Sequence, residues 1–177
     1  MPPKSRRRVP PPDTEPTNAA VVFASERLVG QALAAALVDA GAAASATLAD
    51  SPDDARVLCL RLRPALVILS LDVARAAATI HLVRRIRAIL SATAIVLATR
   101  ETRPTTLREA YDAGATFAIP LDADAPELLR WSRRAMASPV QVPLELWLAA
   151  HARHEEEKRM PAGPAAPRLS PRQRQIL

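Results

Sequence analysis

The feature that most constrains the fold is a fivefold alternation of short apolar runs with helical patterns across residues 19–138. The third and fourth runs are almost continuously apolar, which is typical of parallel strands covered on both faces. Successive strand–helix units imply right-handed crossovers. The pattern therefore predicts an α/β fold with a doubly wound, five-stranded parallel sheet. The expected strands are Ala20–Ala24, Ser45–Ala49, Ala65–Leu71, Ala94–Thr99 and Thr116–Leu121.

The segments between these strands carry signals for the start and the end of helices. A first helix is expected at Leu28–Ala40, ending at Gly41, and a fifth at about Pro126–Ala137. Ser51 followed by Pro52 is typical of an N-cap with proline at the first helical position. The second, third and fourth expected helices each carry an apolar stripe at helical spacing that should face the core. These stripes are Ala55, Leu58, Cys59 and Leu62 in the second helix, Leu82, Val83, Ile86, Ile89 and Leu90 in the third, and Leu107, Ala110 and Tyr111 in the fourth.

The composition narrows the class of protein further. Hydrophobic residues make up 49% of the chain but aromatic residues only 3%, so the core must consist of Ala, Val, Leu and Ile. The single cysteine, Cys59, excludes an internal disulfide, and its place on a helix stripe predicts a packed apolar thiol. No apolar run approaches the roughly 20 residues of a membrane span, and no apolar region follows the basic start as in a secretory signal. We expect a cytoplasmic protein without membrane association.

Basic clusters lie near both ends of the chain, whose formal net charge is +6. Such clusters can neutralise nucleic-acid phosphates, and the alternative for the first cluster is a solvated arm. Residues 1–18 are rich in proline and poor in apolar side chains, so they cannot offset their ordering entropy and are expected to form a disordered arm. The clusters are Lys4, Arg6, Arg7 and Arg8, and Arg168, Arg172 and Arg174.

The pattern changes after Ser138. A linker helix is expected within residues 139–160, opened by Pro143, and a Pro/Ala linker within residues 161–168. Residues 169–177 begin with Ser170-Pro171-Arg172-Gln173, a capping box that predicts the start of another helix, too short to be stable alone. The apolar stripe of the linker helix is Leu144, Trp147, Leu148 and His151.

Several stretches resemble known bacterial regulators. Residues 63–71, 82–87 and 113–117, which read Arg-Pro-Ala-Leu-Val-Ile-Leu-Ser-Leu, Leu-Val-Arg-Arg-Ile-Arg and Ala-Gly-Ala-Thr-Phe, resemble the receiver domain of response regulators in order and spacing. The ending at residues 169–177 resembles the first helix of a LuxR-type helix-turn-helix. Together they resemble the NarL/FixJ class of two-domain transcription regulators. This resemblance implies a flavodoxin/CheY-like receiver with a C-terminal linker helix, and a DNA-binding domain of which this chain carries only the start.

The resemblance also implies where the phosphoacceptor pocket falls. In this two-component family an aspartate ending the third strand accepts the phosphoryl group. Acidic residues after the first strand hold Mg²⁺, and a lysine after the fifth strand neutralises charge. In this chain Ser70 occupies the position of the acceptor aspartate, and Leu121 occupies the position of the lysine. Ala24 and Ser25 occupy the positions of the acidic pair, with Glu26 beside them, and Ala118 occupies the position of the aromatic switch residue. Of the family's functional groups only the hydroxyl residue at the end of the fourth strand is kept, as Thr99.

These substitutions predict a degenerate pocket that takes up no phosphoryl group. A serine at position 70 cannot replace the aspartate without a different activating base. The alternative that stays open is Asp72 as a displaced acceptor or metal ligand, together with Glu26. The histidines, His81, His151 and His154, have no partners at ligand spacing. We therefore expect no metal, no cofactor and no enzymatic activity.

The first hypothesis is a pseudo-receiver that acts as a homodimer, through a protein partner, or through a small molecule in the emptied pocket. Another is a stand-alone interaction module whose basic tails bind nucleic acid weakly. Family members dimerise through the fourth helix, fifth strand and fifth helix, or through the first and fifth helices. By resemblance, the candidate dimer or partner face comprises Leu107, Tyr111, Ala118, Leu128, Leu129 and Trp131.

Overall fold

The computed structural model describes residues 17–100, 103–137 and 141–159. Five parallel strands form one sheet in the order β2-β1-β3-β4-β5, which confirms the predicted doubly wound topology. The strands are β1 (Thr17–Phe23), β2 (Ser45–Leu48), β3 (Pro64–Leu71), β4 (Ala94–Thr99) and β5 (Phe117–Pro120).

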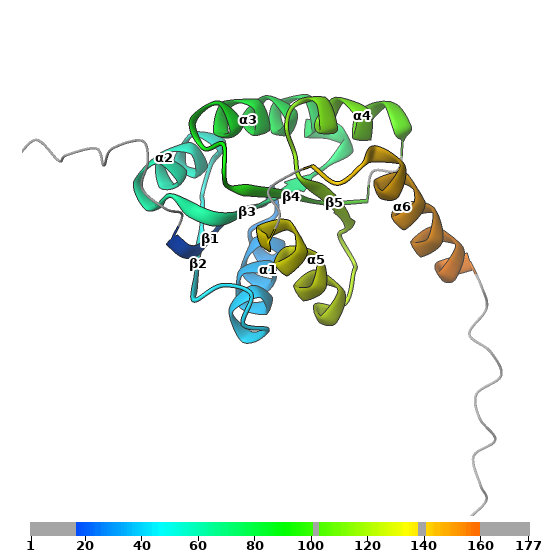
Figure 1. The fold of residues 1–177 in the computed structure, drawn as a ribbon, viewed down its shortest axis with the longest axis horizontal. Coiled ribbons are helices and arrows are strands. Elements are labelled where there is room, and N and C mark those ends of the chain that lie inside the picture. Colours follow the sequence, from blue (N-terminus) through cyan, green and yellow to red (C-terminus); the bar gives the residue numbers. More distant parts are fainter. Residues whose placement is uncertain (1–16, 101–102, 138–140, 160–177) are drawn as a thin grey trace, which may run out of the picture.

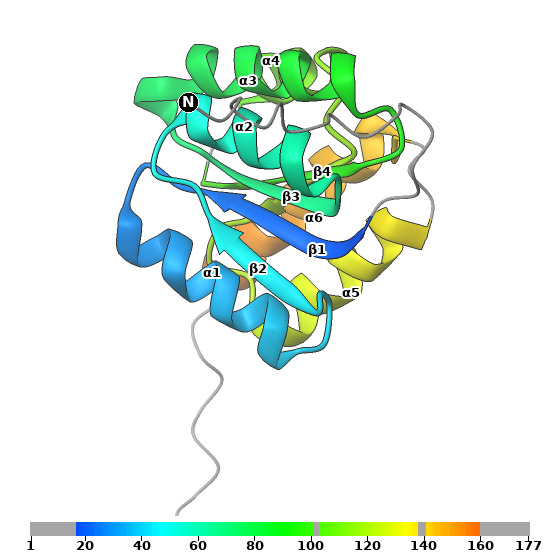
Figure 2. The ribbon, with the colours of Figure 1, turned by 90° about the vertical axis from the view of Figure 1, so that its left-hand side faces the viewer.

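Helices cover both faces of this sheet (Figure 1). Figure 2 shows α1 and α5 on one face and α2, α3 and α4 on the other. A short 3₁₀ turn that the sequence pattern did not predict, η1 (Val73–Arg75), joins β3 to α3. The α-helices are α1 (Arg27–Asp39), α2 (Pro52–Leu62), α3 (Ala76–Ile89), α4 (Pro104–Asp112), α5 (Ala125–Ala137) and α6 (Leu144–Arg159).

The centre of the core is the pair of strands β3 and β4. Every residue of β4 is buried, and so is every residue of β3 except Ala65. This burial explains their almost continuous apolar sequence, because helices cover both faces of the sheet. On one face α1 approaches β2 closely at Gly30, where a Cβ atom would lie 2.5 Å from Leu48 Cδ1. A larger residue at position 30 would force the Leu48 side chain to move.

The start of α2 follows the predicted capping pattern. Ser51 Oγ accepts a hydrogen bond of 3.0 Å from the backbone N–H of Asp54, and Pro52 occupies the first helical position. The helix ends at Arg63, which adopts a left-handed conformation with φ of 47°. Inside the helix Cys59 is fully buried as a free thiol, and this burial raises the pKa of Cys59 to about 12.

Arg87 on α3 connects two loops at the amino-terminal edge of the sheet. Its Nε donates a hydrogen bond to the Gly114 carbonyl at 2.9 Å, and Nη2 donates to Thr116 Oγ1 at 3.2 Å. Nη1 donates to the carbonyls of Ser91 and Thr93 at 2.7 and 2.9 Å. Burial lowers the pKa of Arg87 from its ordinary value. The planar guanidinium supplies enough donors to satisfy carbonyls that neither loop pairs internally.

One predicted boundary is wrong. β1 begins at Thr17, inside the segment 1–18 that was expected to be a disordered arm. Thr17 N–H donates to the Arg63 carbonyl at 2.9 Å and its Oγ1 donates to the Leu62 carbonyl at 2.8 Å. Hydrogen bonds to the two residues that precede β3 thus extend the strand beyond its apolar run. Ala24, expected within the strand, follows its end, and β2, β3 and β5 end within one residue of the predicted positions.

Several predictions lie outside the described residues. They concern the basic clusters at both ends, the Pro/Ala linker at 161–168 and the helix-turn-helix start at 169–177. Within the part that is described, no helix combines the length and the apolar character needed to cross a membrane.

Candidate functional site

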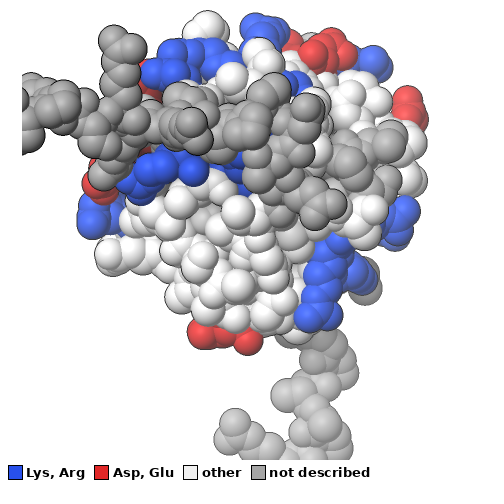
Figure 3. All heavy atoms as spheres, turned by 60° about the vertical axis from the view of Figure 1, so that its left-hand side comes forward, with Lys and Arg blue, Asp and Glu red and all other residues white. Residues whose placement is uncertain are grey.

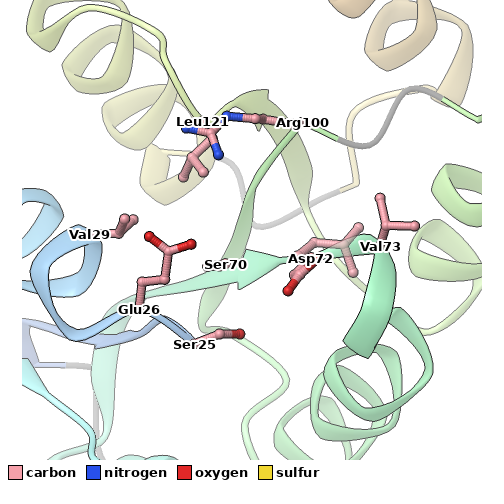
Figure 4. A pocket seen from close by; sticks show the side chains of 9 residues that line it. Ser25, Glu26, Val29, Ser70, Asp72, Val73, Arg100 and Leu121 are labelled. Atoms are coloured by element: carbon pink, nitrogen blue, oxygen red, sulfur yellow. The ribbon is translucent and has the colours of Figure 1, made fainter.

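A cavity of about 220 Å³ opens at the carboxyl ends of the parallel strands. In doubly wound sheets this edge, where the strand order reverses, is where ligands bind. Figure 4 shows side chains reaching this space from the ends of β1, β3 and β4 and from the start of α1. The cavity is lined by Ser25, Glu26, Val29, Ser70, Leu71, Asp72, Val73, Arg100 and Leu121.

The structure brings together five of the seven residues that the sequence placed in the pocket: Ser25, Glu26, Ser70, Asp72 and Leu121. Ala24 and Thr99, the other two, are buried and do not line the cavity. The lining also contains four residues that the sequence reasoning missed, Val29, Leu71, Val73 and Arg100.

Ser70 is the last polar residue of β3 and is only 7% exposed. Its carbonyl accepts a hydrogen bond of 3.5 Å from Thr79 Oγ1, while its own Oγ has no hydrogen-bond partner in the described part of the chain. The position that the resemblance assigns to the acceptor aspartate therefore carries a largely buried serine that lines the cavity.

Asp72 lines the same cavity but its carboxylate has a structural partner. Its Oδ1 accepts a hydrogen bond of 3.1 Å from the backbone N–H of Ala74 and caps η1. A short polar side chain that bonds to the backbone two residues ahead is the usual way to stabilise such a turn. This contact ties one of the Asp72 oxygens to the loop after β3.

Glu26 and Arg100 carry opposite charges into the cavity. Figure 4 shows the Glu26 carboxylate and the Arg100 guanidinium reaching toward the same space from the start of α1 and from the end of β4. Neither side chain forms a hydrogen bond or an ion pair within residues 17–100, 103–137 and 141–159. The sequence feature that could have predicted Arg100 as a cavity residue is its position directly after Thr99, since residues that follow parallel strands gather at this edge.

Thr99 is fully buried at the end of β4. Its Oγ1 donates a hydrogen bond of 2.8 Å to the Leu71 carbonyl on the neighbouring strand. The hydroxyl that the resemblance identifies as the one kept functional group is thus held by the backbone of β3, away from the cavity.

The donor set of the cavity does not resemble a metal centre. Among the residues that the structure describes, no group of three or more His, Cys, Asp or Glu side chains is arranged to hold a metal ion. His81 is exposed on α3 and His151 is buried on α6, while the side chain of His154 lies outside the description. The two carboxylates in the cavity, Glu26 and Asp72, are accompanied by the cationic Arg100.

A second region of interest is the surface formed by α4 and β5, because α6 packs against both. The predicted linker helix is therefore an integral part of the domain. Hydrogen bonds hold the segment before α6 in place. Val142 N–H donates to the Thr116 carbonyl at 3.1 Å, and the side-chain Nε2 of Gln141 donates to the carbonyls of Tyr111 and Ala115 at 2.5 and 2.9 Å. Figure 1 shows α6 beside the edge strand β5.

Four of the five aromatic residues in the chain meet under α6. Phe117 on β5 stacks on Trp131 of α5 with ring centroids 4.1 Å apart. Trp147 of α6 is fully buried and meets Tyr111 of α4 edge to face, with centroids 5.4 Å apart. Aromatic pairs in these geometries add to the free energy of burial. Trp147 thus attaches α6 to α4 and β5, and Phe117 extends the cluster to α5.

The candidate dimer face is largely internal. Leu107, Ala118 and Leu128 are buried, and Tyr111, Leu129 and Trp131 are half-buried. None of the six is an exposed side chain in this structure, because α6, α5 and the sheet cover them. The homodimer itself stays a prediction.

Known structures place this geometry in a class. The fold is similar to the signal receiver domain of the response regulator NarL from Mycobacterium tuberculosis, with a TM-score of 0.59 and 18% identity, over 70% of this chain and 99% of that one. A response regulator from Thermotoga maritima matches with a TM-score of 0.61 and 21% identity over 69% of this chain and 99% of its own. A LuxR-family two-component response regulator from Aurantimonas sp. SI85-9A1 matches with a TM-score of 0.60 and 16% identity, over 78% of this chain and 97% of its own.

These similarities show that the chain has the CheY-like receiver fold. No family model and no curated protein sequence matches the chain. At such identities the structural likeness establishes the fold, and the chemistry must be argued from the residues of the cavity.

Proposed function

We propose that this chain is a phosphorylation-independent pseudo-receiver that regulates a DNA-binding transcription regulator. The observation that carries the proposal is Ser70 at the end of β3, where a receiver needs the acceptor carboxylate. Leu121 stands at the position of the charge-neutralising lysine and lines the same cavity. The receiver fold supports a signalling role, and the LuxR-family regulator among the similar structures supports an output through DNA binding.

A second candidate function is a phosphorylatable receiver that uses Asp72 as a displaced acceptor. The observation in its favour is that Asp72 and Glu26 line one cavity. Against it, Asp72 Oδ1 already caps η1 through the N–H of Ala74. A phosphoryl group on Asp72 would also share the cavity with the Glu26 carboxylate, without a lysine at position 121 to offset the added charge.

Intact-mass measurement after incubation with acetyl phosphate and Mg²⁺ tests the choice between these functions. We expect no phosphoryl adduct on the wild-type protein. An adduct on the wild type that is missing from the Asp72→Asn variant would overturn the proposal and establish the displaced acceptor.

The regulatory form in this proposal is a homodimer that uses α1. The surface of α4 and β5 is covered by α6 of the same chain, whereas α1 carries an exposed stripe of Leu28, Ala32, Ala35 and Val38. Leu28 is 79% exposed and Val38 is 42% exposed. Figure 3 shows a broad surface without charged side chains on this side of the molecule, which is typical of a protein–protein contact.

Light scattering coupled to gel filtration tests this interface. Leu28→Glu is expected to convert a dimer into a monomer, because a carboxylate would be buried without a partner in the contact. Val57→Glu is the matched control, since Val57 is 48% exposed on α2 at the opposite face of the sheet. A monomeric wild type, or a Leu28→Glu protein that stays dimeric, would contradict this interface.

A further inference from the structure

We infer that the cavity at the carboxyl ends of β1, β3 and β4 binds a small zwitterion, an α-amino acid. Its carboxylate would pair with Arg100 and its ammonium group with Glu26. The inference rests on the proposed function, because a pocket that accepted a phosphoryl group with Mg²⁺ would use the same space.

The first argument is the pairing of charges. Glu26 and Arg100 line one cavity, carry opposite charges and have no ion-pair or hydrogen-bond partner within the described residues. Two opposite charges that approach one space without meeting each other are complementary to a molecule that carries both charges. A guanidinium binds a carboxylate through two parallel N–H donors, which adds directional specificity to the attraction.

The second argument is the hydroxyl of Ser70, which opens into the cavity. Its side chain is 7% exposed, lines the cavity, and has no hydrogen-bond partner in the described structure. A hydroxyl that opens into a cavity and has no partner in the protein is free to hydrogen-bond to a molecule that enters from solution. Ser25, which is half-buried on the same wall, adds a second hydroxyl.

The third argument concerns size and shape. A volume of about 220 Å³ is smaller than the roughly 300–1,000 Å³ of pockets for drug-sized ligands. It fits a metabolite of a few heavy atoms. Val29, Val73 and Leu121 form an apolar part of the wall that suits an aliphatic side chain.

The charge balance favours a ligand with both charges over simpler ligands. An inorganic anion would be attracted by Arg100 but repelled by the carboxylates of Glu26 and Asp72. A metal ion would meet the reverse situation, with Arg100 repelling it and fewer than three acidic, His or Cys ligands at hand among the described residues. A ligand with both charges is complementary to the two sides of the cavity together.

Isothermal titration of the full chain with each proteinogenic L-amino acid at millimolar concentration tests the inference. At least one aliphatic amino acid is expected to bind, while its N-acetyl and amide derivatives bind about tenfold more weakly or not at all. Equal binding of the N-acetyl derivative would overturn the inference in favour of an anion site, and equal binding of the amide in favour of a cation site. Absence of binding by every amino acid would also overturn it.

Matched variants locate the ligand. Arg100→Gln and Glu26→Gln are each expected to weaken binding about tenfold. Arg84→Gln on α3 and Glu109→Gln on α4 are exposed controls that should leave it unchanged. Thermal unfolding checks that all four variants fold, and the derivative series on the wild type remains decisive if one does not. The phosphorylation assay tests the proposed function separately from this inference, because a phosphoryl adduct would overturn the proposed function whatever the titration with amino acids shows.

Discussion

The indole of Trp147 on α6 meets the ring of Phe117 on β5 edge to face, with ring centroids 5.9 Å apart. The contact joins the sixth helix to the edge strand of the receiver sheet. Trp147 is fully buried, whereas its neighbour Leu146 is 44% exposed. The helix therefore has one face that belongs to the core of the domain and another that faces solvent.

Replacing Trp147 by alanine should lower the free energy of unfolding by about 3–5 kcal/mol, because it removes a buried aromatic side chain and leaves a cavity. Trp147→Phe should cost less, since the indole N–H is buried without a hydrogen-bond partner among the described residues. Urea denaturation measures both, with Leu146→Ala as the control on the same helix. Equal losses for Trp147→Ala and Leu146→Ala would show that α6 does not stabilise the domain.

Arg87→Gln should destabilise the protein by about 3 kcal/mol, because several hydrogen bonds from a charged donor are lost. Arg87→Lys should not restore stability, since an ammonium group lacks the planar set of donors that reaches both loops. Arg84→Gln, on the exposed side of the same helix, is the control and should change stability by less than about 0.5 kcal/mol. Urea denaturation of the three variants and the wild type measures these changes in the free energy of unfolding.

Cys59 should make stability fall at alkaline pH. Burial raises its pKa from 9.0 to about 12, so above pH 9 the unfolded chain loses the thiol proton while the folded chain keeps it. The folded state is then favoured fully below pH 9 and progressively less toward pH 12. At pH 10 the loss should be about 1.4 kcal/mol relative to pH 8.

Urea denaturation at pH 8 and pH 10 of the wild type and of Cys59→Ala isolates this effect, because every other titrating group is shared by the two proteins. The difference in stability between them should shrink at pH 10. A difference that does not change with pH would show that the thiolate is tolerated in the core.

Restoring an aspartate at position 70 alone should not restore phosphorylation. Ser70→Asp would return the acceptor carboxylate, but Leu121 would still stand where a lysine is needed and Ser25 where an acidic metal ligand is needed. Intact-mass measurement with acetyl phosphate and Mg²⁺ should show no adduct on the single variant. The triple variant Ser25→Asp, Ser70→Asp, Leu121→Lys should gain a phosphoryl adduct. Labelling of the single variant would contradict this prediction, because the remaining residues would then be enough for phosphorylation at position 70.

Much of the architecture could be predicted because its signals are local. The almost continuously apolar run of β4 was predicted with both of its end residues. Ser51 was predicted as an N-cap, and the hydrogen bond that it accepts from Asp54 confirms this. The start of β1 at Thr17 escaped prediction, because polar residues join that strand through hydrogen bonds to residues 62 and 63, far away in sequence.

The cavity could be predicted only in part. Ser25, Ser70 and Leu121 were assigned to the pocket through the resemblance to receiver domains, and the structure brings them together because parallel strands end at one edge of the sheet. Arg100 stands in such a place too, but its significance comes from Glu26, which lies 74 positions earlier and across the cavity. No rule of sequence spacing links two residues that line one cavity only because the sheet brings distant strand ends together.

By itself, the sequence determined the layers, the order of helices and strands, and the presence of a serine at the position that the resemblance assigns to the acceptor aspartate. Periodicity, caps and residue identity are properties of neighbouring residues, so they can be read without a fold. Only the tertiary structure decided that α6 packs on β5 through Trp147, and that Glu26 and Arg100 share a cavity with the hydroxyl of Ser70. These relationships depend on which distant side chains the closed sheet and its helices bring within contact, and burial of apolar surface selects that arrangement for the chain as a whole.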